Sequence, residues 1–171
     1  MEKALARLNS LPPEEARAEL LKCCGSARWA EGVAARRPYG SAEELEGTAD
    51  RVWRELSPED WLEAFGAHPK IGERKAAAEV SAEARAWSER EQSGAGGASA
   101  ETLSALAAGN RAYEERFGFI FIVCATGKTA DEMLALLRGR IDNDSETELR
   151  VAATEQWRIT ELRLRKFLNV K

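Results

Sequence analysis

The chain has 171 residues, a formal net charge of −4 and a sequence pI of about 5.3. Its content of 44% hydrophobic and 32% charged residues is typical of a globular protein and excludes a largely disordered one. The acidic balance argues against general binding to nucleic acid or to anionic membranes. No stretch approaches the roughly 18 uninterrupted apolar residues of a membrane span.

A chain of this length can bury a substantial core, so we expect a single domain over residues 1–171. The cysteines, Cys23, Cys24 and Cys124, form neither a C-x-x-C pair nor a plausible disulfide framework. The N-terminal stretch MEKALARLNS lacks the apolar core of a signal peptide. We therefore expect a protein of the reducing cytoplasm.

Local signals predict helices along most of the chain. Residues 12–24 open with prolines and acidic residues and stop before Gly25, a typical helix end. Ser57 followed by Pro58 predicts a helix that starts at residue 58. Apolar residues at helical spacing predict two long helices, over 103–117 and 145–167. Capping boxes of the form S/T-x-x-E predict further helix starts at Ser41 with Glu44, Thr129 with Glu132, and Ser145 with Glu148.

One stretch does not fit this helical pattern. Residues 117–125, FGFIFIVCA, are aromatic and β-branched, and their propensity alone favours a buried strand. A lone strand would have no partner in a chain of helices. The remaining possibilities are an unusual helix start or an extended backbone packed in the core.

The sole histidine of the chain, His68, is a candidate proton-transfer group. It lies between Gly66 and Pro69, and the proline disfavours a helical conformation for the residue before it. We expect the imidazole to project from a rigid turn at a helix end, where functional groups are common. Histidine can both give and take a proton near neutral pH. The alternative is an exposed or helix-capping histidine.

A second candidate cluster lies in the stretch SAEARAWSEREQSG. Helical spacing puts Ser88, Glu91 and Gln92 on one face of a short helix. A hydroxyl, a carboxylate and an amide together suit a small polar heterocycle with ureido groups, although such a face can also be simply solvated. In the C-terminal helix, Arg158, Arg163 or Arg165 could bind a substrate carboxylate, and at most one of them is expected to face a pocket.

Other kinds of site are excluded by missing residues. The sequence ATGKTADE ends like a phosphate-binding loop, but Ile122 occupies the position where that loop needs its first glycine. A single histidine and adjacent cysteines make a zinc enzyme implausible. The G-x-S-x-G turn of serine hydrolases is absent.

Taken in order, several blocks of the sequence resemble the OHCU decarboxylase family, whose members act on 2-oxo-4-hydroxy-4-carboxy-5-ureidoimidazoline (OHCU) in the route from urate to allantoin. The resemblance covers nearly the whole chain and is greatest to the plant and bacterial branches of the family. The blocks are LLKCCGSARWAEGVAARRPYGS, AHPKIG, WSEREQS, NRAYEERFGFIFIVCATGK and RIDNDSETELRVAATEQWRITELRL. The loop SGAGGAS after Gln92 departs from the family in length and glycine content.

This resemblance implies an all-α fold of about eight helices, a homodimer, and cofactor-free decarboxylation that yields (S)-allantoin. It implies no metal, and it implies that residues 117–125 are not a strand. His68 and Glu91 match the family's catalytic positions. The implied substrate-binding residues are Pro69, Ser88, Gln92, Phe121, Ile122, Val123, Cys124, Ala125 and Arg163, with Arg158 as the alternative arginine.

Two other functions are compatible with the sequence. An all-α adaptor would use His68 only as a turn residue and would need an apolar patch for its partner. A related lyase or hydrolase on the same fold would act on another small heterocycle, because a fold does not fix a substrate.

Overall fold

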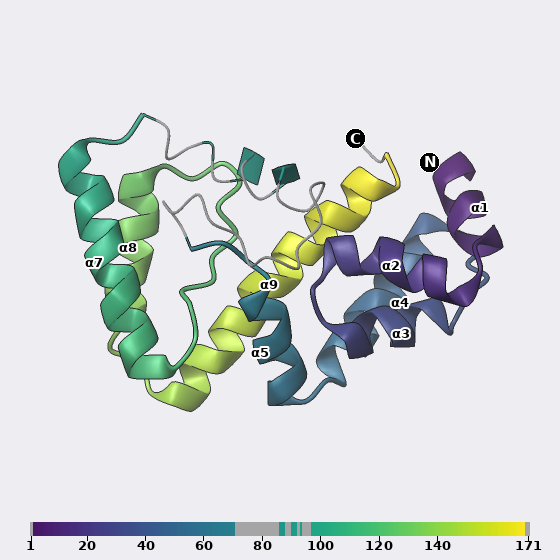
Figure 1. The fold of residues 1–171 in the computed structure, drawn as a ribbon, viewed down its shortest axis with the longest axis horizontal. Coiled ribbons are helices and arrows are strands. Elements are labelled where there is room, and N and C mark those ends of the chain that lie inside the picture. Colours follow the sequence, from purple (N-terminus) through teal and green to yellow (C-terminus); the bar gives the residue numbers. More distant parts are fainter. Residues whose placement is uncertain (1, 71–85, 88–89, 92, 94–96, 170–171) are drawn as a thin grey trace. The chain divides into compact units, whose positions relative to one another are not determined.

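A computed structural model describes residues 2–70, 86–87, 90–91, 93 and 97–169 (Figure 1). The described part of the chain is helical and contains no strand, so the predicted all-α class is confirmed. Its helices are α1 (Glu2–Ser10), α2 (Pro13–Cys23), α3 (Ala27–Ala34), α4 (Ala42–Arg54), α5 (Pro58–Gly66), α7 (Ala100–Phe117), α8 (Ala130–Arg140) and α9 (Ser145–Phe167).

The chain divides into two compact units, the first formed by residues 1–64 and 157–171. In this unit α2 packs on α3, and α3 packs on α4. Trp29 is completely buried, and its indole N–H donates to the Ala49 carbonyl at 3.1 Å, which satisfies the one polar group of that side chain. The expectation of a single domain over residues 1–171 stays a prediction.

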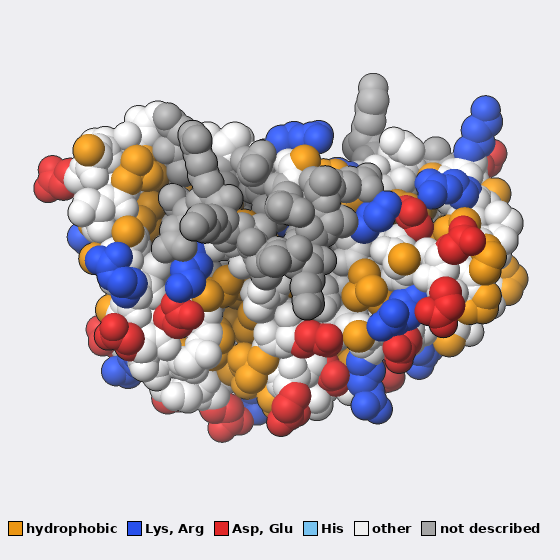
Figure 2. Space-filling view, viewed as in Figure 1, with side chains coloured by type: hydrophobic (Ala, Val, Ile, Leu, Met, Phe, Trp, Pro, Cys, Tyr) orange, Lys and Arg blue, Asp and Glu red, His pale blue; other side chains and the backbone are white. Residues whose placement is uncertain are grey.

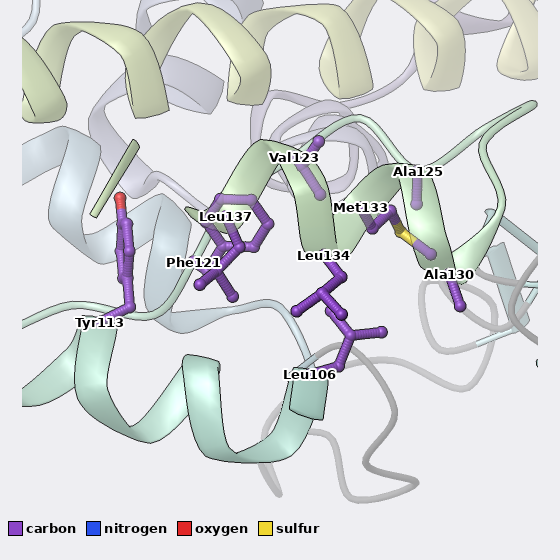
Figure 3. Close-up of a cluster of buried hydrophobic side chains, with 9 residues drawn as sticks. All are labelled: Leu106, Tyr113, Phe121, Val123, Ala125, Ala130, Met133, Leu134 and Leu137. Carbon is purple, nitrogen blue, oxygen red and sulfur yellow. The ribbon is translucent and has the colours of Figure 1, made fainter. Parts of the chain in front are cut away.

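The second unit spans residues 65–156 and contains the helix pair α7 and α8, which lie side by side in Figure 1. Gly109 allows a close approach in this pair, because a Cβ atom at that position would lie 2.9 Å from Leu137 Cδ2. The buried cluster in Figure 3 joins both helices to the chain between them through Leu106, Tyr113, Phe121, Val123, Ala125, Ala130, Met133, Leu134 and Leu137.

The stretch after α7 is neither helix nor strand. Gly118 adopts a left-handed conformation with φ of 77°, which ends α7 as a glycine C-cap does. The following residues have no regular secondary structure, yet Phe121 to Ala125 are all buried. Tertiary packing therefore overrides strand propensity here, as the family resemblance implied, and an extended backbone in the core is the outcome. We call Phe121–Ala125 the site segment.

The helix starts follow the sequence signals, but two of the predicted capping boxes need correction. At α4, Ser41 accepts from the Glu44 N–H at 3.2 Å as expected, whereas the Glu44 carboxylate accepts from the Gly40 N–H. At α8, Thr129 accepts from the Glu132 N–H while the Glu132 carboxylate accepts from the Thr129 N–H, so this predicted capping box is confirmed. The box predicted at Ser145 and Glu148 is wrong. Asp144 accepts the Thr147 N–H at 2.9 Å and caps α9, because the Glu148 carboxylate is used inside the protein instead.

Candidate active site

His68 lies in a turn directly after α5, as predicted from its glycine and proline neighbours. Helix α5 ends at Gly66, and the His68 N–H donates to the Phe65 carbonyl at 3.1 Å. The histidine is half-buried. A group in this setting can contact a small molecule while the backbone that carries it is held by the preceding helix.

Contacts on both sides of His68 fix this turn within the second unit. Before it, the Phe65 ring packs against the Phe119 ring, with the centroids 5.4 Å apart. After it, the Lys70 ammonium pairs with the Glu114 carboxylate of α7 at 2.5 Å. Both contacts lead to the end of α7 and to the chain that continues into the site segment, so the turn is tied to that region.

The described part of the predicted polar helix also faces inward. Trp87 and Glu91 are one helical turn apart, and both are 8% exposed. A buried carboxylate is costly unless it has a role or a partner, and Glu91 does make further interactions. Ser88 and Gln92 lie outside the described residues, so their predicted roles stay predictions.

Glu91 lies close to the site segment. Burial is the main cause that raises the pKa of the Cys124 thiol, and the negative charges of Glu155 and Glu91 raise it further. The Lys128 ammonium acts in the opposite direction. One predicted catalytic group, Glu91, is thus near enough to the predicted substrate-binding residue Cys124 to act on its thiol through charge.

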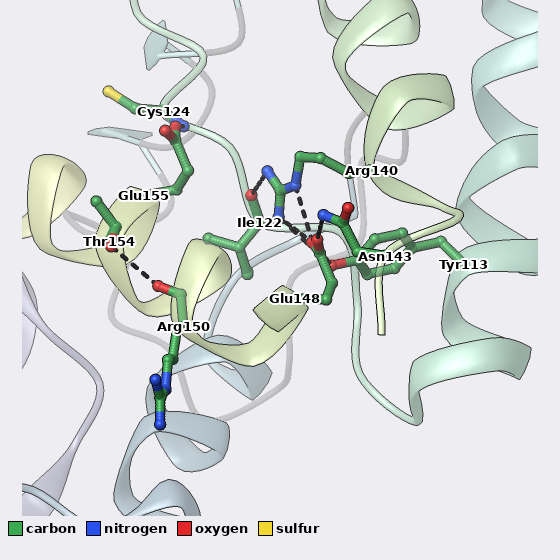
Figure 4. Close-up of polar contacts among 9 residues, drawn as sticks. All are labelled: Tyr113, Ile122, Cys124, Arg140, Asn143, Glu148, Arg150, Thr154 and Glu155. Atoms are coloured by element: carbon green, nitrogen blue, oxygen red, sulfur yellow. Dashed lines mark hydrogen bonds and ion pairs between the residues drawn. The ribbon is translucent and has the colours of Figure 1, made fainter. Parts of the chain in front are cut away.

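The site segment is held in place by charged side chains (Figure 4). An Arg140 guanidinium N–H donates to the Ile122 carbonyl at 2.8 Å, and the Cys124 N–H donates to the Glu155 carboxylate at 2.8 Å. The Lys128 ammonium donates to the Cys124 carbonyl at 2.6 Å. These contacts replace the ladder of hydrogen bonds that a sheet would supply.

Arg140 is itself fixed by a buried polar network. The Glu148 carboxylate, which is fully buried, accepts from Arg140 at 2.5 Å, from the Tyr113 hydroxyl and from the Asn143 amide. The Arg140 guanidinium also lies 4.6 Å from the centre of the Phe121 ring. Sequence reasoning missed this network, because Glu148 has the spacing of an ordinary capping residue and nothing local marks it as buried.

Arg163 belongs to the first unit and is 5% exposed, whereas Arg158 is exposed. The positive charge of Arg163 acts on Cys24, which is completely buried. Burial raises the pKa of the Cys24 thiol to about 11, while its hydrogen bonds to Ser26 and Thr160 and the Arg163 charge lower it by smaller amounts. The assignment of a substrate-binding role to Arg163 stays a prediction.

A cavity of about 490 Å³ occurs in the first unit, among residues that include Asn9, Pro13 and Pro38. None of the predicted site residues lines it.

Among the residues described, no group of His, Cys, Asp and Glu side chains could hold a metal ion, and no helix is long and apolar enough to cross a bilayer. On the face displayed in Figure 2, acidic and basic side chains are interspersed.

The chain is thus an all-α protein with a half-buried histidine after α5, a buried glutamate and a backbone segment that charged side chains hold in place. The family model described as OHCU decarboxylase matches residues 9–165, and the chain belongs to this family.

Similar proteins were found in both sequence and structure comparisons. The "Uric acid degradation bifunctional protein TTL" of Arabidopsis thaliana is 40% identical over 149 residues, which are 87% of this chain and 46% of that protein. The "2-oxo-4-hydroxy-4-carboxy-5-ureidoimidazoline decarboxylase" of Haloferax volcanii is 33% identical over 79% of this chain and 77% of its own length. The chain therefore spans about half of the plant relative and most of the archaeal one.

A solved structure, "Crystal structure of OHCU decarboxylase in the presence of (S)-allantoin", matches with a TM-score of 0.77 and 40% identity. The match covers 88% of this chain and 97% of the other. At this level of identity and coverage, the likeness extends to the whole fold of that protein.

Proposed function

We propose that this protein decarboxylates OHCU to (S)-allantoin in urate degradation, as a carboxy-lyase without a cofactor. The observation that carries the proposal is the family match over residues 9–165, which includes His68, Glu91 and the whole site segment. The name of the Haloferax volcanii relative, most of whose length is covered, points to the same substrate.

The reaction is feasible for a protein that supplies only binding, orientation and a proton. When the carbon–carbon bond to the carboxylate breaks, CO₂ leaves and the electron pair delocalises into the adjacent C=N bond of the ring. The substrate thus carries its own electron sink. The protein has to hold the carboxylate out of the ring plane, stabilise the developing charge and protonate one face of the carbon.

In this mechanism His68 delivers the proton to the carbanion carbon, and Pro69 contacts the substrate beside it. Glu91 binds a ring hydroxyl or N–H and orients the imidazole. The site segment offers backbone donors and acceptors, which suit the ureido and ring amides. Its burial in the described structure and the nearness of Glu91 to Cys124 support these roles.

Three further roles complete the proposed site. Ser88 and Gln92 hold the ureido and ring amides. Arg163 is the positive anchor for the substrate carboxylate. Arg163 is buried and Arg158 is exposed, which favours Arg163, because a buried guanidinium binds an anion more strongly than an exposed one.

The rate of OHCU loss tests the proposal. OHCU is generated from urate by the two upstream enzymes and followed with wild type, His68→Ala and Tyr39→Phe. We expect wild type and Tyr39→Phe to accelerate the loss, and His68→Ala to lower kcat about 10²–10⁴-fold, the usual contribution of a general acid. Equal activity of wild type and His68→Ala would remove His68 from the mechanism.

Substrate choice is tested by the same assay with hydantoins and ureidoglycolate. We expect turnover of OHCU alone. Faster turnover of another ring would assign the site to a related lyase or hydrolase, and no turnover of any of them would favour an adaptor function.

We also propose a homodimer, on the basis of the family resemblance, and a location in the cytoplasm, because Cys23, Cys24 and Cys124 form no C-x-x-C pair and no plausible disulfide framework. Size-exclusion chromatography with light scattering should give twice the mass of the 18.8 kDa chain. A monomeric mass at micromolar concentration would contradict the dimer.

A further inference from the structure

The direction of the backbone in the site segment is set from outside the segment. All its peptide bonds are trans, since the described chain has its cis bond at Arg37–Pro38. In a trans peptide the C=O and the N–H point in opposite directions. A side chain that binds one of these groups therefore also aims the other.

Two anchors act on the peptides that flank Val123. Arg140 binds the Ile122 carbonyl, so the Val123 N–H of the same peptide points away from Arg140. Glu155 binds the Cys124 N–H, so the Val123 carbonyl of that peptide points away from Glu155. Charged side chains that bind Ile122 and Cys124 thus orient both polar backbone groups of Val123.

The two anchors differ in how firmly they are built. Arg140 belongs to the buried network with Glu148 and Tyr113, whose loss would disturb the core as a whole. Glu155 is half-buried on α9, and its carboxylate accepts the Cys124 N–H in a charge-assisted hydrogen bond. Glu155 can therefore be changed with less risk to the fold.

A second observation connects Glu155 with the candidate active site. Glu155 and Glu91 both raise the pKa of the Cys124 thiol through their charge, so both carboxylates act on the same residue of the site segment. Lys128 provides the opposite charge there through its bond to the Cys124 carbonyl. The N–H side of Cys124 thus faces a carboxylate and its C=O side faces an ammonium, and reversing either peptide would bring like charges together.

We propose that Glu155 is a positioning residue for the decarboxylation. This inference rests on the function proposed above. By accepting the Cys124 N–H it holds the Val123–Cys124 peptide in one orientation, and so fixes the backbone that the site segment is proposed to present to the substrate. It does not exchange a proton with the substrate. Its contribution is the hydrogen bond, and a neutral acceptor of the same size replaces it.

The test compares kcat, KM and thermal stability of wild type with three variants of Glu155. Glu155→Ala removes the acceptor, Glu155→Gln keeps an oxygen acceptor without the charge, and Glu155→Asp keeps the charge but withdraws it by one methylene. Glu146→Ala is the matched control, because Glu146 lies on the same helix and pairs with Arg150 on the surface.

We expect Glu155→Ala to lower kcat about tenfold to 10²-fold, the range expected for a small misplacement of a substrate contact. Glu155→Gln should stay within about threefold of wild type, with an unchanged pH profile, because its amide oxygen still accepts the N–H. Glu155→Asp should lower kcat in a folded protein, and Glu146→Ala should change nothing.

Several results would overturn the inference. One is wild-type kcat in Glu155→Ala. Another is a Glu155→Gln variant that is as slow as Glu155→Ala with a shifted pH profile, since the carboxylate would then act through its charge. If Glu155→Ala does not fold, a kcat of Glu155→Asp equal to that of the wild type overturns the inference. A wild type that does not turn over OHCU defeats the proposed function and this inference together, whereas an active wild type with insensitive variants defeats only the inference.

Discussion

The hydroxyl of Tyr113 donates to a fully buried carboxylate, that of Glu148, and so belongs to the network behind the site segment. Burial and this hydrogen bond raise the pKa of Tyr113 well above its ordinary value. An acceptor that loses a donor inside the protein bears a desolvation cost that water cannot offset.

We therefore expect Tyr113→Phe to lower the free energy of unfolding by about 1–3 kcal/mol, since the acceptor it leaves is charged. Urea denaturation measures this value. Tyr39→Phe is the control, because the Tyr39 hydroxyl donates to a neutral carbonyl, that of Val33, at 2.6 Å. An equal or smaller loss in Tyr113→Phe than in Tyr39→Phe would argue against a special role for the network.

Cys24 gives a prediction about pH. Its pKa is raised from 9.0 to about 11, mainly by burial, so the folded state keeps the thiol proton where the unfolded state has lost it. The contribution to stability is complete below pH 9 and is lost as the pH rises toward 11. Between pH 9 and pH 11 we expect the free energy of unfolding of the wild type to fall by on the order of 2 kcal/mol more than that of Cys24→Ala. Denaturation at a series of alkaline pH values checks this, and parallel curves for the two proteins would contradict it.

At the scale of single elements, the contact between α7 and α8 depends on the missing side chain of Gly109. In a helix interior, alanine is normally more favourable than glycine by about 1 kcal/mol of helix propensity. Here an added Cβ would meet three atoms of the Leu137 side chain at 2.9, 3.2 and 3.7 Å, and Leu137 is buried in the core cluster. Overpacking of this kind costs typically 1–3 kcal/mol.

We therefore expect Gly109→Ala to lower the melting temperature in spite of its better helix propensity. Gly47→Ala is the matched change, because Gly47 is exposed within α4 and its Cβ would meet nothing within 4 Å. That variant should gain about 0.5–1 kcal/mol. Differential scanning calorimetry of both variants decides the matter, and stabilisation by both would show that α7 and α8 can separate at no cost.

Element boundaries were largely predictable from sequence because their signals are local. Helix α5 starts at Pro58 as expected, and Thr129 with Glu132 caps α8. The capping box at Ser145 failed for a tertiary reason. Glu148 is recruited by Tyr113 and Arg140, which are distant in sequence, and Asp144 takes over the cap.

At the scale of the whole molecule, the helical class and the family were predictable because the sequence blocks occur in order over nearly the full chain. The non-helical site segment was predictable only from the resemblance, since its own propensity favours a strand. Its anchors, Arg140 and Glu155, were not predictable, because they act on backbone atoms of residues far from them in sequence.

The optical activity of the product tests most directly the proposed protonation of one face of the carbanion that CO₂ leaves behind. OHCU is generated fresh from urate, and circular dichroism is recorded while allantoin forms, with and without wild-type protein. We expect a growing (S)-allantoin signal with the protein, whereas the spontaneous reaction gives a racemate and no signal. A trace with wild type that equals the spontaneous one would contradict stereospecific protonation by the protein.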